Sequence, residues 1–124
     1  MNEKLTAQNK ANPIDIQGFS TYCRENADLI QKLLDSFVQV GPPYLKELCD
    51  AIESNDADGI RSICHKIRGA GSIIRAEPLL EIVEEVRKSA VDANFDRAKG
   101  FLPELKKAFA DVIDFIERFN AGSE

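Results

Sequence analysis

His65 is the only histidine in this chain of 124 residues and the first candidate for nucleophilic chemistry. Apolar residues recur around it at helical spacing, namely Ile60, Ile63, Cys64, Ile67 and Ile74. At about 100° per residue these positions share one face of a helix, and His65 lies roughly 140° from Ile60, so its ring should face solvent. A neutral imidazole nitrogen is a nucleophile, and histidine is mostly neutral at cytoplasmic pH. The spacing therefore predicts an accessible nucleophile on the outer face of a helix.

Positively charged side chains lie close to this histidine in the sequence. Arg61 and Arg68 stand four residues before it and three after it, on neighbouring helix positions, and Lys66 follows it directly. Gly69, four residues after it, has no side chain and leaves the space beside the imidazole open. The cations should disfavour the imidazolium and would also face a bound phosphoryl group, which carries about −1.5 to −2 charges. Because phosphoryl transfer depends on positioning and charge neutralisation, this cluster suits a phosphoryl acceptor that needs no general base.

Arg61, Arg68 and Arg75 are seven residues apart and form a ridge between the core face and His65. In a purely structural interpretation they cover the edge of the core and pair with glutamates such as Glu81 or Glu84. In a functional interpretation, Arg61 and Arg75 steer an acidic partner toward the histidine, in a salt-sensitive way. Both interpretations stay open for these two arginines.

The elements that must hold this segment are predicted to be helices. Asp15, Asn26 and Asp56 are suited to capping the first three, and Asn94 to capping the last. Apolar stripes with helical period follow the caps, at Ile16, Phe19 and Cys23; Leu29, Ile30, Leu33, Leu34, Phe37 and Val38; Tyr44, Leu45, Leu48, Cys49 and Ile52; Leu79, Ile82, Val83, Val86 and Ala90; and Phe101, Leu102, Leu105, Phe109, Val112, Phe115, Ile116 and Phe119.

The segment Gly41-Pro42-Pro43 interrupts the second helix, but the apolar stripe continues nearly in phase beyond it. A long helix that is kinked or briefly broken there is expected. Gly100 and Pro103 weaken the first turns of the last helix. No convincing strand is visible, and the links between helices are short. The sequence therefore predicts an all-α antiparallel up-down four-helix bundle with an additional short N-terminal helix, made of a flexible lead (residues 1–13) and one bundle (residues 14–121).

The segment after the third cap resembles a known family. The residues His65, Ile67, Arg68 and Gly69, followed by Ile74 and Ala76, are similar to the His-x-Leu-Lys-Gly…Leu-Gly-Ala pattern of histidine-containing phosphotransfer (HPt) domains. The predicted helix layout fits this family from about residue 15 to 120. Two positions depart from the pattern. Arg68 replaces the lysine and keeps its charge, and Arg75 places a bulky cation where the family usually has glycine.

The resemblance implies a histidine phosphotransfer protein that relays phosphoryl groups between receiver-domain aspartates in two-component signalling. By matched position His65 would be the phospho-acceptor and Arg68 the phosphate-stabilising cation, assisted by Lys66, while Gly69 would permit close approach. Ser72, about two turns along the same face, is expected to touch the phosphate or the partner. The implied partners are response-regulator receiver domains or a hybrid sensor kinase. Magnesium would be bound by the receiver, so no cofactor is expected on this chain, which would be a phosphocarrier rather than an enzyme.

Two other classes of function are alternatives to the relay. One is a helical adaptor that binds a signalling partner without chemistry, and the other is a cytosolic metal or thiol protein. Cys64 adjoins His65, but residues i and i+1 of a helix diverge by about 100°, which disfavours a Cys–His catalytic pair. The three cysteines lack the spacing of zinc sites, and no Glu-x-x-His pair suggests a di-iron bundle, so no metal site is expected.

The composition of the chain narrows its possible partners and its cellular compartment. The net charge is −5, whereas nucleic-acid binding normally needs a basic footprint, so nucleic acid is not an expected partner. No run of 18 apolar residues or signal-peptide core is present, and membrane association is not expected. Three cysteines without close spacing fit free thiols in a reducing compartment. A cytoplasmic monomer is the expectation.

Overall fold

A computed structural model describes residues 12–122, and the part of the predicted flexible lead that covers residues 1–11 lies outside this range. Within it the elements are helices, and no strand is found: α2 (Ile16–Tyr22), α3 (Ala27–Glu53), α4 (Ala57–Ile73), α5 (Glu77–Val91), α6 (Phe95–Gly100) and α7 (Leu102–Ala121). Asp15, Asn26, Asp56 and Asn94 cap helices as predicted, because each side chain accepts a hydrogen bond from a backbone N–H three residues later.

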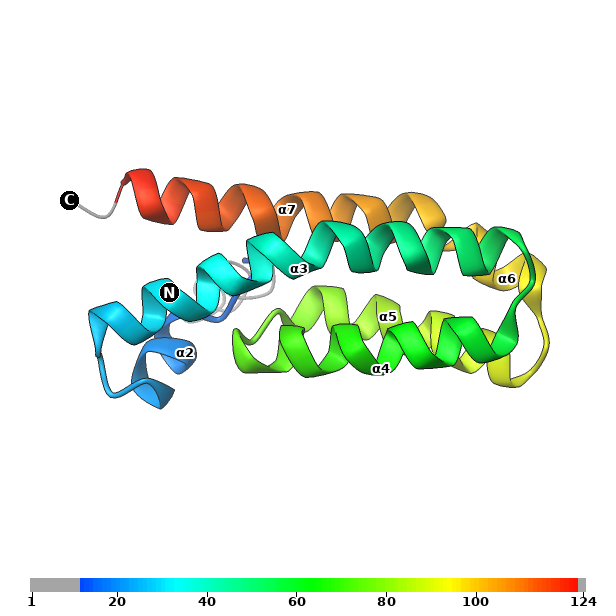
Figure 1. The fold of residues 1–124 in the computed structure, drawn as a ribbon, viewed down its shortest axis with the longest axis horizontal. Coiled ribbons are helices and arrows are strands. Elements are labelled where there is room, and N and C mark those ends of the chain that lie inside the picture. Colours follow the sequence, from blue (N-terminus) through cyan, green and yellow to red (C-terminus); the bar gives the residue numbers. More distant parts are fainter. Residues whose placement is uncertain (1–11, 123–124) are drawn as a thin grey trace, which may run out of the picture.

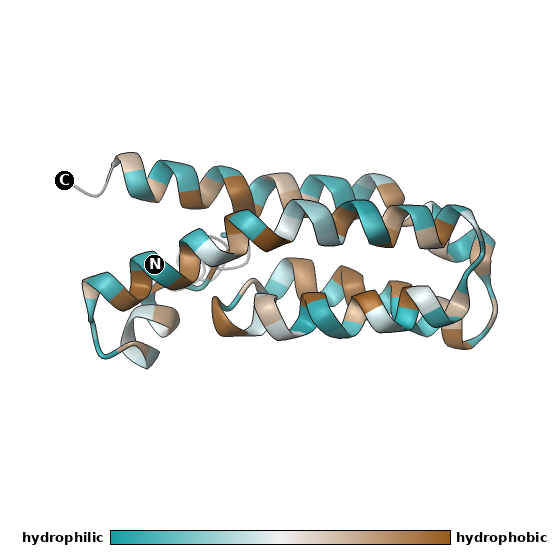
Figure 2. Cartoon of the chain, in the orientation of Figure 1, coloured by the Kyte–Doolittle hydropathy of each residue, from teal (hydrophilic) through white to brown (hydrophobic). Residues whose placement is uncertain are grey.

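The four long helices form the predicted antiparallel up-down bundle (Figure 1). Helix α3 packs against α4 and α7, and α5 packs against the same two neighbours, so the core lies between the pair α3/α7 and the pair α4/α5. The apolar side of each helix is turned toward this interior (Figure 2). Helix α2 lies across one end of the bundle, where Phe19 is fully buried. The resulting scaffold holds α4 rigidly along its whole inner face.

Helix α3 runs through Pro42 and Pro43 without a break, although it changes direction near its middle (Figure 1). Proline cannot donate a backbone hydrogen bond, so the carbonyls one turn earlier lose their partners. Both prolines are exposed, so this part of α3 borders on solvent. Gly41 faces inward at this bend, where Phe37 and Phe109 stack with ring centroids 5.9 Å apart. A Cβ at Gly41 would come within 3.1 Å of Phe37, so glycine permits the close approach of α3 and α7.

The last predicted helix is divided in two, which corrects the single helix expected after Asn94. Asn94 caps only the short helix α6, and Phe101 separates it from α7. Pro103 then lies in the first turn of α7, where the missing N–H has no intrahelical partner to lose. Where weak helical turns are expected at Gly100 and Pro103, α6 therefore ends and α7 begins.

Two positions differ from the predicted core. Leu29, which is expected in the apolar stripe, is 39% exposed in the first turn of α3, whereas Ile30 next to it is buried. Ile14, which precedes the first predicted cap, is fully buried. No helix among the described residues is long and apolar enough to cross a membrane.

Candidate functional site

Helix α4 presents His65 on its solvent-exposed face, as its spacing predicts. The Asp56 carboxylate accepts a hydrogen bond of 2.9 Å from the Gly59 N–H and fixes the start of the helix. The opposite face is buried by Ile60, Ile63, Cys64, Ile67 and Gly71. The imidazole makes no hydrogen bond or ion pair with any residue from 12 to 122, so both ring nitrogens are open to a reactant.

The basic residues around His65 divide into paired and unpaired side chains. Arg61 donates to Asp58, one turn earlier, at 2.6 Å, and this corrects the expectation that it pairs with a glutamate. Arg68 and Lys66 are exposed and form no ion pair within the described part of the chain. Arg68, three residues after His65 and on a neighbouring helix position, therefore has no ion-pair partner that competes with a reactant at the histidine.

Gly69 opens the surface beside the histidine. A Cβ placed at Gly69 would meet no other atom within 4 Å, so the notch predicted from the sequence is real space rather than a packed contact. Ser72 is exposed two turns from His65, and Ile73, one turn beyond Gly69, is 45% exposed. An open surface with one apolar side chain at its edge is suited to docking a macromolecule.

Arg75 lies apart from this group. Its side chain runs toward α2, where its Cδ atom would be 3.2 Å from a Cβ at Gly18, and it is partly buried there. The Asp15 N–H donates a 3.0 Å hydrogen bond to the Arg75 carbonyl, which ties the start of α2 to the end of α4. The ridge predicted from three arginines seven residues apart therefore ends at Arg68, because the chain leaves α4 before Arg75.

Arg75 also adopts a left-handed backbone conformation, with φ 60°. The Ala76 N–H donates to the Gly71 carbonyl and the Arg75 N–H to the Ser72 carbonyl, the hydrogen bonds of a Schellman motif that ends α4. Glycine is the usual residue at this position of the motif, because it has no Cβ to oppose a positive φ. This left-handed conformation explains why the HPt pattern has glycine at the position that Arg75 occupies in this chain.

We expect Arg75→Gly to increase the free energy of unfolding by about 1 kcal/mol relative to Arg75→Ala, because alanine keeps the left-handed strain and glycine removes it. Chemical denaturation of the two variants measures the difference. Equal stabilities would show that the strain at this residue is negligible.

The sequence offered Glu84 only as a possible partner for the arginines near His65, and Arg87 is not among the predicted site residues. Arg87 donates to both oxygens of Glu84, with Nε–Oε1 3.0 Å and Nη2–Oε2 2.6 Å. Hydrogen bonding to Arg87 lowers the pKa of the Glu84 carboxyl, and the charge of Arg68 on α4 acts in the same direction. The spacing of three residues indicated that Glu84 and Arg87 could pair, but their nearness to Arg68 depends on how α5 packs on α4.

The Cys64 thiol is enclosed in the core and donates to the Val83 carbonyl at 3.7 Å. Burial raises the pKa of this thiol to about 12. Because the thiolate is the nucleophile, Cys64 is unsuited to a catalytic pair with His65. No group of three or more potential metal ligands is found in the described residues.

Alkylation of the folded protein with iodoacetamide at pH 8 should therefore reach the partly buried Cys49 before Cys64. Burial raises the pKa of the Cys49 thiol as well, so its reaction should be slow. At a pKa of about 12, roughly one Cys64 in ten thousand is ionised at pH 8. Peptide mapping by mass spectrometry measures the order, with the unfolded protein as a control in which all three cysteines react. Modification of Cys64 before Cys49 would contradict the burial of the Cys64 thiol.

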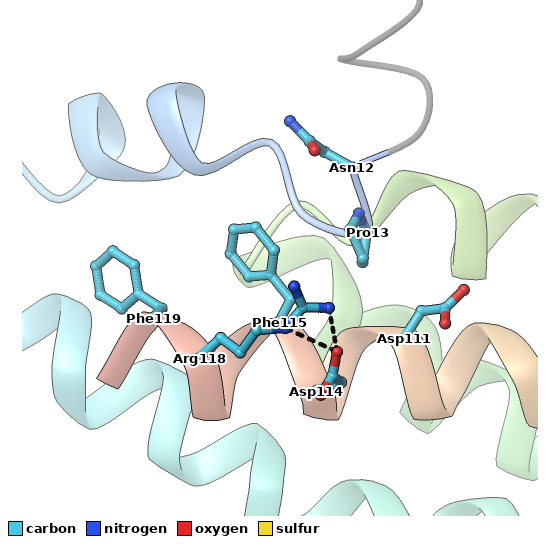
Figure 3. Close-up of a pocket in the computed structure, with 7 residues that line it drawn as sticks. All are labelled: Asn12, Pro13, Asp111, Asp114, Phe115, Arg118 and Phe119. Carbon is cyan, nitrogen blue, oxygen red and sulfur yellow. Dashed lines mark hydrogen bonds and ion pairs between the residues drawn. The ribbon is translucent and has the colours of Figure 1, made fainter. Parts of the chain in front are cut away.

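A concave region lies elsewhere on the molecule. A cavity of about 540 Å³ is lined by Asn12 and Pro13 and by five residues of α7, including the ion pair of Asp114 with Arg118 (Figure 3). None of the predicted site residues lines it. Another cavity, of about 630 Å³, is lined by Arg75 and by residues of α2 and its flanks. His65 lines neither cavity and lies instead on an open helix face.

The fold and this helix face together define a class of protein: a four-helix bundle that presents one histidine, a cation three residues later and a glycine four residues later. Residues 32–115, well over half of the chain, match the family model described as the Hpt domain. The chain therefore belongs to the Hpt domain family, the histidine phosphotransfer proteins of two-component signalling.

Individual relatives agree with this assignment. The chain is 26% identical over 98 residues to the phosphorelay intermediate protein rdeA of Dictyostelium discoideum, a match that covers 79% of this chain and 39% of that protein. The chain thus spans well under half the length of this curated relative. Its fold is similar to that of the histidine-containing phosphotransfer protein B (HptB) from Pseudomonas aeruginosa PAO1, with a TM-score of 0.78 and 25% identity. That likeness covers 87% of this chain and 94% of HptB.

Proposed function

We propose that this protein relays phosphoryl groups between receiver-domain aspartates and that His65 is the phospho-acceptor. The observation that carries the proposal is the exposed, unbonded imidazole on the rigid helix α4, next to the open notch at Gly69 and the unpaired Arg68. A nucleophile held on a rigid element and accessible from solvent needs no rearrangement before it reacts.

In the proposed step, the imidazole nitrogen that carries no hydrogen attacks the phosphorus of a receiver's aspartyl phosphate. A P–N bond forms as the P–O bond to the aspartate breaks, and the aspartate leaves as a carboxylate with the bonding electron pair. The other ring nitrogen releases its proton to solvent. Transfer to a second receiver reverses these events, so the protein is a phosphocarrier that is regenerated without net chemistry on its own chain.

The neighbouring residues have separate roles in this proposal. Arg68 stabilises the phosphoryl oxygens, and Lys66 adds positive charge from the adjacent position. Gly69 allows the receiver's active-site loops to approach the ring. Ser72 contacts the phosphoryl group or the partner, while Arg61 contributes at longer range because Asp58 already holds its guanidinium. Arg75 is proposed only as a peripheral docking residue.

The proposed partners are receiver domains of response regulators or of a hybrid sensor kinase, which would supply the magnesium ion. The positive charges around His65 suit an acidic receiver pocket, and Ile73 offers an apolar contact at the edge of the same face. Docking of modest affinity is expected, because a relay must release its product. The three free cysteines fit a reducing compartment, which supports action in the cytoplasm.

The test is phosphoryl transfer from a panel of phosphorylated receivers to the purified protein. Acid-labile phosphate on this chain, located on His65 by mass spectrometry at alkaline pH, is the expected result. Receivers that bind but leave the chain unlabelled would instead indicate an adaptor without chemistry.

A further inference from the structure

We propose that Arg87 is a positioning residue for phosphoryl transfer, because its two hydrogen bonds to Glu84 keep that carboxylate from pairing with Arg68. This inference rests on the proposed function of His65. It concerns the control of the phosphate-binding cation rather than the identity of the acceptor.

The first observation is the geometry of the pair on α5. The guanidinium of Arg87 engages both carboxylate oxygens of Glu84, at 3.0 Å and 2.6 Å, and each side chain is 33% exposed. A two-pronged arginine–carboxylate contact that is partly shielded from water is stronger and better oriented than an ordinary surface ion pair. Both carboxylate oxygens of Glu84 therefore already accept a hydrogen bond from Arg87 on the same helix, α5.

The second observation is the position of Arg68 across the helix interface. Helices α4 and α5 are packed together, and the Cys64 thiol, one turn before Arg68, reaches the carbonyl of Val83 beside Glu84. The Glu84 carboxylate responds to the charges of both arginines, since its pKa is lowered first by the hydrogen bond with Arg87 and further by Arg68. Glu84 thus lies within the electrostatic reach of three cations, Arg87, Arg68 and Lys88, but forms hydrogen bonds with only Arg87.

The consequence is a competition for one carboxylate. If the guanidinium of Arg87 were missing, Glu84 would lose both hydrogen bonds, and the remaining cations that act on it would be Arg68 and Lys88. Lys88 already pairs with Glu85 at 3.8 Å, whereas Arg68 forms no ion pair among residues 12–122, so Arg68 is the replacement that we infer. An Arg68 engaged with Glu84 would have its charge neutralised and its donors turned away from His65. Loss of one charge-assisted hydrogen bond to the phosphoryl group corresponds to about a tenfold change.

A double-mutant experiment tests the competition. Arg87→Met, Glu84→Gln and the double variant are labelled with phosphoramidate, a small donor that needs no docking, and the phosphohistidine formed is quantified by ³¹P NMR. We expect Arg87→Met to slow labelling about tenfold, Glu84→Gln to match or exceed the wild type, and the double variant to return to within about twofold of it. Arg87→Lys keeps the charge but lacks the two-pronged contact, so an intermediate rate is expected.

Two controls separate the alternatives. Arg118→Met removes the arginine of a more exposed ion pair with Asp114 on α7 and should leave the labelling rate unchanged. Thermal melts of each variant report any loss of folding. A double variant as slow as Arg87→Met would overturn the inference, because it would mean that Arg87 acts on the phosphoryl group itself or through general stability. A wild type that phosphoramidate and receivers both fail to label would overturn the proposed function together with the inference.

Discussion

Replacement of His65 with glutamine is expected to abolish phosphoryl acceptance, lowering labelling by any phosphorylated receiver by more than about 100-fold. Glutamine has a similar size and polarity but lacks the nucleophilic ring nitrogen. The imidazole is exposed and has no partner among residues 12–122, so the substitution should change the free energy of unfolding by less than about 0.5 kcal/mol. Transfer kinetics and chemical denaturation of the same preparation measure the two effects.

Binding provides the matched control for this prediction. A receiver should bind His65→Gln about as well as the wild type, because docking uses the surrounding face of α4 rather than the ring alone. Calorimetry with the unphosphorylated receiver measures this affinity. Labelling that persists in His65→Gln would place the acceptor on another residue, and unimpaired signalling in the absence of labelling would favour the adaptor.

Gly69→Leu is expected to slow transfer from a receiver by about 100-fold while making the domain more stable. The leucine side chain would fill the open space beside His65 and hold the receiver's reactive phosphoryl group away from the ring. No other atom lies within 4 Å of a Cβ at Gly69, so leucine should fit the isolated domain without strain. Replacing a glycine inside a helix should add about 0.5–1 kcal/mol to the free energy of unfolding.

The chain offers a control for this substitution at Gly100. This glycine also lies in a helix, is exposed and would have no atom within 4 Å of an added Cβ, but it belongs to α6. Gly100→Leu should leave transfer unchanged. Labelling by phosphoramidate should survive in Gly69→Leu much better than labelling by a receiver, because the small donor needs less space. Equal loss with both donors would mean that leucine disturbs the imidazole itself rather than the docking of a partner.

Opposite effects on stability and transfer distinguish a functional glycine from a structural one. Gly41 is a structural example, because a Cβ there would press on Phe37 in the core. Gly69 has no such contact, and we propose that the space beside it admits an incoming receiver. The two glycines look alike in the sequence, and only their surroundings separate them.

Much of the fold could be predicted from the sequence because its signals are local. The caps at Asp15, Asn26 and Asp56 depend on a side chain and a backbone N–H three residues away. The exposure of His65 follows from its angle to the apolar stripe of its own helix. Neither requires knowledge of any other element. The break at Phe101 does not follow from the sequence, because Gly100 and Pro103, six and nine residues after the predicted cap Asn94, are compatible both with weakened turns and with a new helix start.

The sequence by itself determined a helical bundle from the apolar stripes of its several helices, and an outward-facing histidine, a neighbouring cation and an open notch from the period of one helix. Only the tertiary structure decided that Arg75 turns toward α2 and that the helix of the Glu84–Arg87 pair packs against the helix of Arg68. These relations join residues on different helices. They depend on the register and rotation of packed elements, which the spacing within any single helix does not contain.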